Sequence, residues 1–176
     1  MKKKKTDELN RHDLKSYLKS NKVPVWIILE NIRSAHNVGS FFRTADAFGL
    51  KGISLCGYCA RPPHTQLDKV ALGATESVEW IGFDNGEEAI LDAKGKGYLV
   101  LAIEQVHEAE SLEKIPNPEM GIALVFGNEV TGVDEKTLSS CDGAIEVPQF
   151  GIKHSLNVSV CGGAVLWEAS KKYRFK

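Results

Sequence analysis

The sequence predicts an α/β fold in which a mainly parallel sheet is flanked by helices. Short apolar runs of strand length alternate along the chain with stretches whose apolar residues recur at helical spacing. Polar, glycine-containing segments follow three of these runs, at 30–40, 127–132 and 148–157. Alternation of this kind is typical of a parallel sheet, whose ligands bind beyond the carboxyl ends of the strands. The three polar segments are therefore the candidate site.

The first predicted strand covers residues 23–29, and the first predicted helix covers 37–48. This helix places Val38, Phe41 and Ala45 on one face, and Gly49 follows where a helix commonly stops. The same criteria predict further strands over 53–56, 78–81, 98–103, 121–126 and 144–147, and helices over 85–94, 134–140 and 155–172. Ser155 is the expected N-cap of the last helix.

Length and composition indicate a small intracellular protein. The chain has 176 residues, of which 43% are hydrophobic, enough for a single core. No apolar run approaches the roughly 20 residues that span a bilayer. The N-terminus is basic but lacks the apolar segment of a signal peptide. We therefore expect a soluble, cytoplasmic protein.

The charges are distributed unevenly and indicate two regions. Residues 1–22 carry eight Lys or Arg side chains against three Asp or Glu, whereas the remainder carries 14 against 20. We expect a basic N-terminal arm over 1–22, followed by one domain over 23–176. Lys3, Lys4 and Lys5 in this arm suit attraction to RNA, although a solvated leader would have the same composition.

The four cysteines do not form a recognisable metal or redox motif. Cys56 and Cys59 have C-x-x-C spacing, but Cys141 and Cys161 are too far apart in sequence to supply a second pair of zinc ligands. We expect reduced, partly buried thiols and no metal.

The first two polar segments contain residues with more than one interpretation. Asn37 opens the first helix, and Arg43 is either a solvated surface residue or a phosphate or ribose contact. Glu129 follows Gly127 at a strand end, where it would cap the next element or orient an arginine. Neither segment is a Walker-type loop, and the G-x-G-x-x-G dinucleotide pattern is absent.

The third polar segment suits an adenosine-like ligand better than a phosphate-rich one. Ser155 and Asn157 offer hydrogen bonds, and Val147 and Leu156 offer apolar walls. No Ser/His/Asp arrangement is evident, because His154 and Ser155 are adjacent at a helix start and cannot face each other.

Three blocks together resemble the motifs of the SpoU (TrmH-type) RNA ribose 2′-O-methyltransferases of the SPOUT superfamily. They are NVGSFFRTADAFG (37–49), LVFGNEVTG (124–132) and VPQFGIKHSLNVSV (147–160). The resemblance covers about residues 24–172 and implies a C-terminal deep trefoil knot, a rare exception to general topology rules. It also implies a homodimer whose interface is formed largely by the first and last helices.

The resemblance further implies specific residue roles. S-adenosylmethionine would lie in the knot, against the set Glu104, Gly127, Val147, Ser155 and Leu156. Arg43 would be the catalytic residue, positioned by Asn37, Glu129 and Asn157. Because a guanidinium is a weak proton acceptor, Arg43 could equally serve as a phosphate clamp. Arg33 and Lys153 are further expected RNA contacts, and Lys153-His154 departs from the residues common in relatives at these positions.

The SLN form of the third block and the Ile103-Glu104-Gln105 stretch look most like tRNA guanosine-18 enzymes. We therefore expect tRNA as the substrate, and ribosomal RNA is the alternative within the same class. A non-catalytic RNA-binding protein that retains the knot is a different reading, which the intact set of Asn37, Arg43, Glu129 and Asn157 disfavours. A flavodoxin-type nucleotide-binding domain is disfavoured by the missing phosphate loop.

Overall fold

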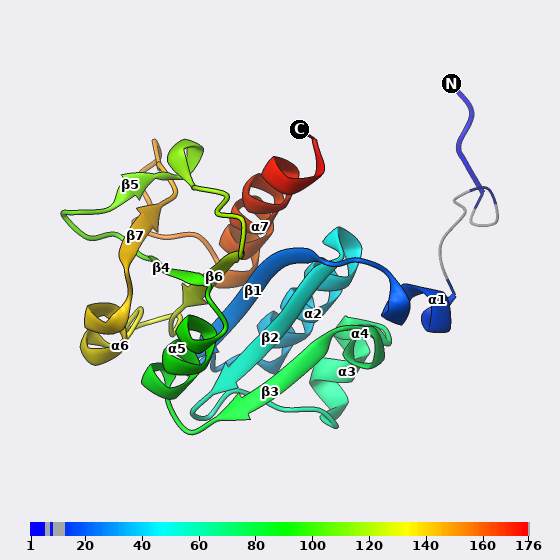
Figure 1. Ribbon diagram of the computed structural model, residues 1–176, viewed down its shortest axis with the longest axis horizontal. Helices are drawn as coiled ribbons and strands as arrows, with labels where there is room; N and C mark the ends of the chain where they lie inside the picture. Colours follow the sequence, from blue (N-terminus) through cyan, green and yellow to red (C-terminus); the bar gives the residue numbers. More distant parts are fainter. Residues whose placement is uncertain (6–7, 9–12, 176) are drawn as a thin grey trace.

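The computed structural model describes residues 1–5, 8 and 13–175. Seven strands form one sheet with the order β3-β2-β1-β6-β4-β7-β5, and all the pairings between these strands are parallel (Figure 1). The strands are β1 (Val23–Glu30), β2 (Leu50–Cys56), β3 (Glu79–Phe83), β4 (Leu99–Ile103), β5 (Glu110–Ser111), β6 (Ile122–Phe126) and β7 (Gly143–Glu146). The helices are α1 (Leu14–Lys19), α2 (Ala35–Phe48), α3 (Thr65–Ala71), α4 (Ala74–Ser77), α5 (Gly86–Gly95), α6 (Glu135–Ser140) and α7 (Val158–Arg174), with a 3-10 turn η2 at Leu112–Lys114.

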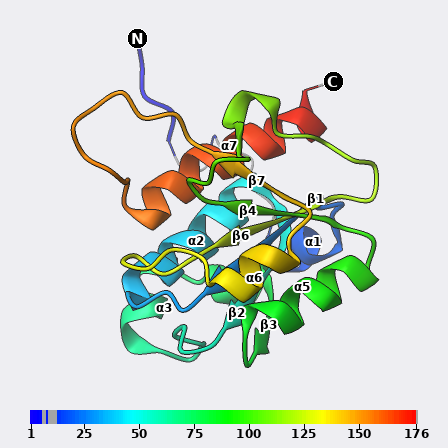
Figure 2. The ribbon, with the colours of Figure 1, turned by 90° about the vertical axis from the view of Figure 1, so that its left-hand side faces the viewer.

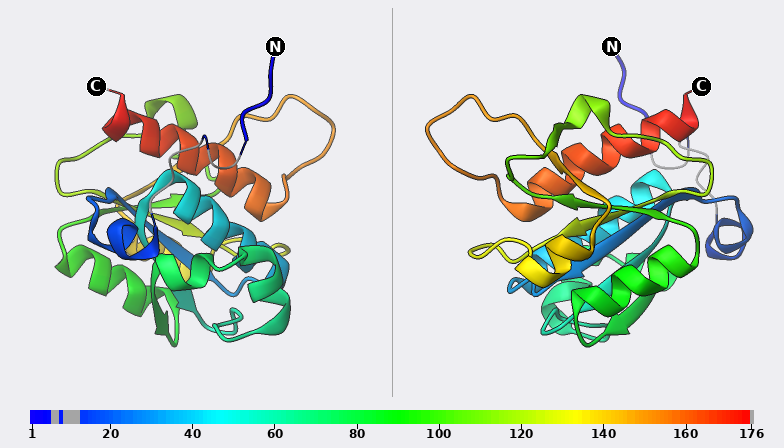
Figure 3. Two further views of the ribbon diagram at one scale, coloured as in Figure 1. Left: turned by 90° about the vertical axis from the view of Figure 1, so that its right-hand side faces the viewer. Right: turned by 60° about the vertical axis from the view of Figure 1, so that its left-hand side comes forward.

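Helices cover both faces of the sheet, so the predicted α/β class is confirmed. Side chains alternate along β1: Ile27 and Leu29 pack in the core beneath α2, α3 and α7, whereas Trp26 and Ile28 pack in the core beneath α5 and α6. Figure 3 shows α2 and α7 on one side of the sheet and α5 and α6 on the other. A strand buried on both faces reads as a continuous apolar run, as residues 23–29 do.

Helix α2 is fixed at both ends and packed closely along its length. Ser34 caps its start, and Gly49 ends it in the left-handed conformation at φ 64°, as predicted. The ring of Phe41 contacts Phe126 of β6 at a centroid distance of 4.9 Å. A Cβ atom at Gly162 would collide with the Phe41 ring, so this glycine permits the close approach of α7 to α2.

The structure corrects the predicted start of the last helix. Helix α7 begins at Val158, and its N-cap is Asn157 rather than Ser155, because the Asn157 side chain accepts hydrogen bonds from the N–H groups of Ser159 and Val160. Ser155 instead belongs to a loop over 148–157 that bows away from the body between β7 and α7 (Figure 2).

Several short elements have no counterpart in the prediction. Helices α3 and α4 occupy 65–77, and β5 is only two residues long. Within the expected arm, α1 is tethered by the Tyr17 hydroxyl, which donates to the Asp46 carbonyl at 3.0 Å. Residues 6–7 and 9–12 of the arm, and residue 176 of the expected domain, lie outside the described residues.

Two further observations concern the predicted cellular setting. No helix in the described ranges combines the length and apolar character needed to cross a membrane. The four cysteines are free, with Cys56 and Cys59 buried and Cys141 and Cys161 half-buried, and their reduced state stays a prediction.

Candidate active site

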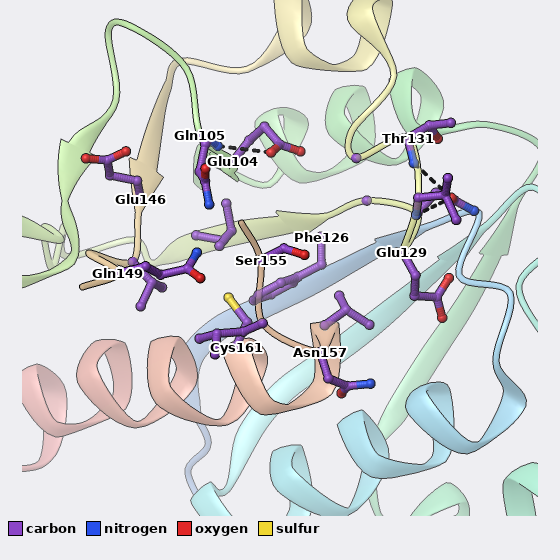
Figure 4. Close-up of a pocket in the computed structure, with 18 residues that line it drawn as sticks. Glu104, Gln105, Phe126, Glu129, Thr131, Glu146, Gln149, Ser155, Asn157 and Cys161 are labelled. Atoms are coloured by element: carbon purple, nitrogen blue, oxygen red, sulfur yellow. Dashed lines mark hydrogen bonds between the residues drawn. The ribbon is translucent and has the colours of Figure 1, made fainter. Parts of the chain in front are cut away.

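A pocket of about 470 Å³ opens at the carboxyl ends of β4, β6 and β7. It is lined by residues from 103–105, 126–132, 146–149 and 155–161 (Figure 4). These segments include two of the three predicted polar loops. All five residues predicted to bind the cofactor lie in its walls, namely Glu104, Gly127, Val147, Ser155 and Leu156. These residues therefore share one cavity, although they come from three different strand ends, and their contact with a cofactor stays a prediction.

The wall formed by residues 127–132 is a tight loop that depends on glycine. Asn128 and Gly132 exchange two backbone hydrogen bonds of 2.9 Å, which fold the segment back on itself. A Cβ atom at Gly127 would overlap the backbone of Gly132 and Val133. Gly132 adopts φ 73°, a conformation that favours glycine. Gly127 is therefore required by the close approach of backbone to backbone, and Gly132 by its left-handed conformation.

Glu104 connects this loop to the end of β4. Its carboxylate accepts hydrogen bonds from the N–H of Val133 at 3.0 Å and of Gln105 at 3.0 Å. A Cβ atom at Gly132 would collide with the same carboxylate. The amide of Gln105 donates to the carbonyl of His154 at 2.9 Å and so joins β4 to the loop over 148–157. Glu104 thus fixes the end of the loop over 127–132, and Gln105 fixes the loop over 148–157.

Glu129 anchors a polar cluster at the rim of the pocket. Its carboxylate accepts hydrogen bonds from the N–H of Arg33 at 2.9 Å, the N–H of Ser34 at 3.1 Å and the side-chain amide of Asn37 at 2.8 Å. Burial acts to raise the pKa of this carboxyl, but the bonds from Arg33 and Asn37 outweigh it and the pKa lies below its ordinary value. Glu129 is therefore ionised near neutral pH and fixes the start of α2.

Asn157 completes the cluster from α7. Its amide nitrogen donates to the Asn37 side-chain oxygen at 3.2 Å, and its own oxygen caps α7. Glu129, Asn37 and Asn157 thus form one chain of hydrogen bonds across β6, α2 and α7. Glu129 does not cap the element that follows it, since the cap of α6 is Asp134. Two of its bonds go instead to backbone N–H groups just before α2, and no bond to an arginine side chain is formed among the described residues.

Arg43 does not join this cluster in the described part of the chain. It is exposed on α2 and lies outside the pocket lining. No hydrogen bond or ion pair within the described residues connects it to Asn37, Glu129 or Asn157. Six residues separate Arg43 from Asn37, which corresponds to about 9 Å along the helix axis. The expected contacts between Arg43 and its three positioning residues are therefore not formed within this single chain.

The other expected RNA contacts are all exposed. Arg33 precedes α2, Lys153 lies in the loop over 148–157, and Lys3, Lys4 and Lys5 are in the N-terminal segment. The backbone N–H of Arg33 is already bonded to Glu129, so only its side chain is available to a partner.

Several pocket residues are absent from the sequence-based set. Gln105, Asn128 and Thr131 adjoin predicted residues at strand ends, and this adjacency is the signal that could have identified them. Cys161 follows Asn157 by four residues on α7 and therefore lies on the same helix face. No group of three or more His, Cys, Asp or Glu side chains suited to a metal is found among the described residues.

The SpoU rRNA Methylase family matches residues 24–167 of this sequence, which include every strand of the sheet except its first residue, Val23, and the complete pocket. The chain belongs to this family. The match agrees with the resemblance carried by the three sequence blocks and covers every residue of the Glu129 cluster.

A curated relative extends over nearly the whole chain. The 23S rRNA (guanosine-2′-O-)-methyltransferase RlmB of Vibrio parahaemolyticus is 32% identical over 167 residues, which are 94% of this chain and 66% of the relative. This chain therefore spans somewhat less than two thirds of the length of that protein.

Solved structures share the fold. The A. aeolicus TrmH/SpoU tRNA modifying enzyme has a TM-score of 0.80 at 26% identity, over 92% of this chain and 81% of that one. An AdoMet-bound rRNA methyltransferase from Sinorhizobium meliloti has a TM-score of 0.79 at 21% identity, over 91% of this chain and 61% of that one.

Proposed function

We propose that this chain binds S-adenosylmethionine in the pocket and transfers its methyl group to a ribose 2′-hydroxyl of RNA. The observation that carries the proposal is the placement of Glu104, Gly127, Val147, Ser155 and Leu156 in one cavity with the Glu129 cluster at its rim. The family and the names of the relatives support the same reaction. Because the relative spans a longer chain, the activity of the whole protein is part of this proposal.

The composition of the pocket fits the cofactor. A volume of about 470 Å³ lies within the roughly 300–1,000 Å³ that small-molecule sites occupy. Ile103, Val147 and Leu156 would provide apolar surface for an adenine ring, and the carboxylates of Glu104 and Glu146 would provide negative charge suited to a cationic ligand. When bound, S-adenosylmethionine supplies an electrophilic methyl group.

The residues of the chain must then align the 2′-hydroxyl and receive its proton. Both oxygens of Glu129 are occupied by donors, so its carboxylate acts as a positioning group that holds Asn37 and Asn157. We assign RNA contact to the exposed Arg43, Arg33 and Lys153. Arg43 acts either as the proton acceptor or as a phosphate clamp, and Asn37 and Asn157 orient the ribose.

Ribosomal RNA is the favoured substrate. The name of the curated relative specifies guanosine in 23S rRNA, which supports the alternative expected from sequence rather than tRNA. Transfer RNA stays the second candidate, because the A. aeolicus enzyme with a TM-score of 0.80 is named as a tRNA modifying enzyme.

We also propose the predicted homodimer and the predicted knot. The outer face of α7 exposes Val160 and Trp167, with exposed fractions of 59% and 48%, and such apolar surface suits burial against a second copy. Light scattering of the purified protein tests the dimer.

The contact of Gln105 with His154 supports a knot, since it holds the loop over 148–157 against the end of β4. An experimental structure traced through 104–157 tests that topology.

The basic arm over 1–22 is proposed as an additional RNA contact beside the domain over 23–176. The exposed Lys3, Lys4 and Lys5 support this assignment. Deletion of residues 1–5 should weaken RNA binding and reduce its salt dependence, while methyl transfer at saturating RNA persists.

The deciding experiment measures methyl transfer from labelled S-adenosylmethionine to unmodified rRNA and tRNA, followed by nucleoside analysis. A 2′-O-methylated nucleoside in the rRNA, lost in Arg43→Ala, is the expected result. Modification of tRNA alone would reverse the substrate assignment. Stabilisation by S-adenosylhomocysteine without transfer to either RNA would favour the non-catalytic RNA-binding reading.

A further inference from the structure

The C-x-x-C stretch begins at the last residue of β2 and forms a turn at the carboxyl end of the strands, where the candidate site also lies. Gly57 adopts φ 62°, and a Cβ atom there would collide with the side chain of Asn31. The thiol of Cys59 accepts a hydrogen bond from the N–H of Ile32 at 3.1 Å and donates to the carbonyl of Leu29 at 3.3 Å. Burial raises the pKa of this thiol to about 11, so the donating proton is present at neutral pH. The turn is therefore clamped to the end of β1.

This clamped turn presents one aromatic side chain to solvent. Tyr58 is 62% exposed, yet its hydroxyl oxygen accepts a hydrogen bond from the Asn128 amide at 2.6 Å. Asn128 also donates to the carbonyl of Asn31 at 2.8 Å and accepts from the N–H groups of Val130 and Thr131. The ring is thus held in one orientation without being buried. An exposed but fixed aromatic ring gains little from core packing and is well suited to receive a flat ligand.

The ring lies beside the pocket already described. Tyr58 lines a second cavity of about 230 Å³, which shares Asn128, Thr131 and Gly132 with the first. The loop over 128–132 is the wall between the two, and Glu129 of the proposed methyl-transfer site belongs to this wall. A group bound on Tyr58 would therefore be a close neighbour of the reacting ribose.

The charge of the second cavity determines which kind of chemical group can bind there. Its walls include the carboxylates of Glu30, Asp134 and Glu135 and, among the described residues, no basic side chain. Such a surface repels phosphate but accepts hydrogen bonds from the amino and imino groups of nucleobases. Unpaired bases in RNA are commonly bound by stacking on aromatic side chains.

We propose that Tyr58 is a stacking platform for an unpaired base of the RNA substrate, at or beside the methylated nucleotide. This inference rests on the proposed function, because it takes RNA as the substrate. The Asn128 amide fixes the ring, and the neighbouring carboxylates favour a base that carries an amino group.

The test compares the RNA affinity of Tyr58→Ala, Tyr58→Phe and the wild type by filter binding in saturating S-adenosylhomocysteine, with KM and kcat for methyl transfer measured alongside. Base–aromatic stacking contributes about 1–3 kcal/mol, so Tyr58→Ala should raise the Kd and KM for RNA by roughly 5- to 150-fold. Tyr58→Phe keeps the ring and should raise them less than about threefold on the same scale. Leu91→Ala removes an apolar side chain of similar exposure from α5, 71% against 62% for Tyr58, and is the matched control.

Three outcomes would overturn the proposal. Wild-type RNA affinity in Tyr58→Ala would exclude stacking. An equal loss in Tyr58→Phe would assign the effect to the hydroxyl bond with Asn128. A parallel loss of S-adenosylhomocysteine binding in Tyr58→Ala would assign it to collapse of the loop over 128–132. An absence of methyl transfer in the wild type, with RNA binding that still depends on the ring, would instead refute only the proposed reaction.

Discussion

Replacing Glu129 by glutamine removes the single charge on which the polar cluster depends. The carboxylate accepts three hydrogen bonds, and glutamine turns one of its two oxygens into an NH₂ group that faces another donor. Hydrogen bonds to a charged group contribute about 1.5–3 kcal/mol each when sheltered, but the exposed Glu129 side chain is partly screened by water. We therefore expect a total loss of about 1–3 kcal/mol, which for a chain of this size lowers the Tm by roughly 2–12 °C.

The pH dependence of this loss has a defined sign. The pKa of Glu129 in the folded chain lies below its ordinary value of 4.5. Its contribution to stability is therefore fully present above pH 4.5 and disappears as the pH falls through the folded-state pKa. The difference in Tm between the wild type and Glu129→Gln should be constant from about pH 5 to pH 8 and should shrink in more acidic buffer.

Differential scanning calorimetry across this pH range measures the difference directly. Glu119→Gln is the control, because Glu119 is exposed and its side chain makes no hydrogen bond among the described residues, so its Tm should shift by no more than about 2 °C. If Glu129→Gln melts like Glu119→Gln at pH 7, or if its deficit persists unchanged in acid, the argument for an ionised anchor is wrong. The same variant should lose about 100-fold in methyl transfer, because Asn37 and Asn157 are no longer held.

Three further predictions concern the cofactor wall, the cap of α7 and the RNA contact. In Gly127→Ala the new Cβ displaces the loop over 128–132. S-adenosylhomocysteine at 100 times its Kd should stabilise the wild type by roughly 2.7 kcal/mol, and this stabilisation should vanish in the variant. Gly95→Ala, which has open space around the new Cβ, should keep it. Asn157→Ala should lower stability by about 1 kcal/mol in chemical denaturation; Asn157→Asp keeps the capping oxygen and should recover that stability but not methyl transfer. Arg43→Ala should abolish methyl transfer and leave S-adenosylhomocysteine binding intact, and a pH–rate profile of Arg43→Lys separates the phosphate clamp, which lysine can replace, from the proton acceptor. Loss of cofactor binding in Arg43→Ala would contradict its placement outside the pocket.

The parts of the fold that the sequence predicts are those with a strong local signal. The run over 23–29 is buried on both faces of the sheet, and a continuous apolar run is the pattern that such a strand requires. The helix ending at Gly49 combines a 3.6-residue repeat with a left-handed C-cap. By contrast, β5 is two residues long, and α3 and α4 are seven and four residues long, so none of them contains enough residues to establish a period.

The start of α7 is mispredicted for a functional reason. Ser155 is a good N-cap by residue type, but Ser155 and Leu156 line the pocket outside any helix, and the cap passes to Asn157. Local preference places a helix start at the first suitable residue. Here the walls of a cavity determine the backbone instead, and those walls come from β4 and β6, far away in the sequence.

The contacts within the site depend on sheet order, which local patterns do not encode. Glu129 reaches Asn37 across 92 residues because β6 lies directly beside β1, so the loops at their carboxyl ends are neighbours. Asn157 reaches Asn37 across 120 residues because α7 packs on α2 through Gly162. The family resemblance names all three residues, but their bonding pattern requires the three-dimensional arrangement. That pattern leaves Arg43 outside the cluster in one chain. In the reaction proposed above, the group that positions Arg43 therefore has to come from the RNA, from a second copy or from a movement of α2.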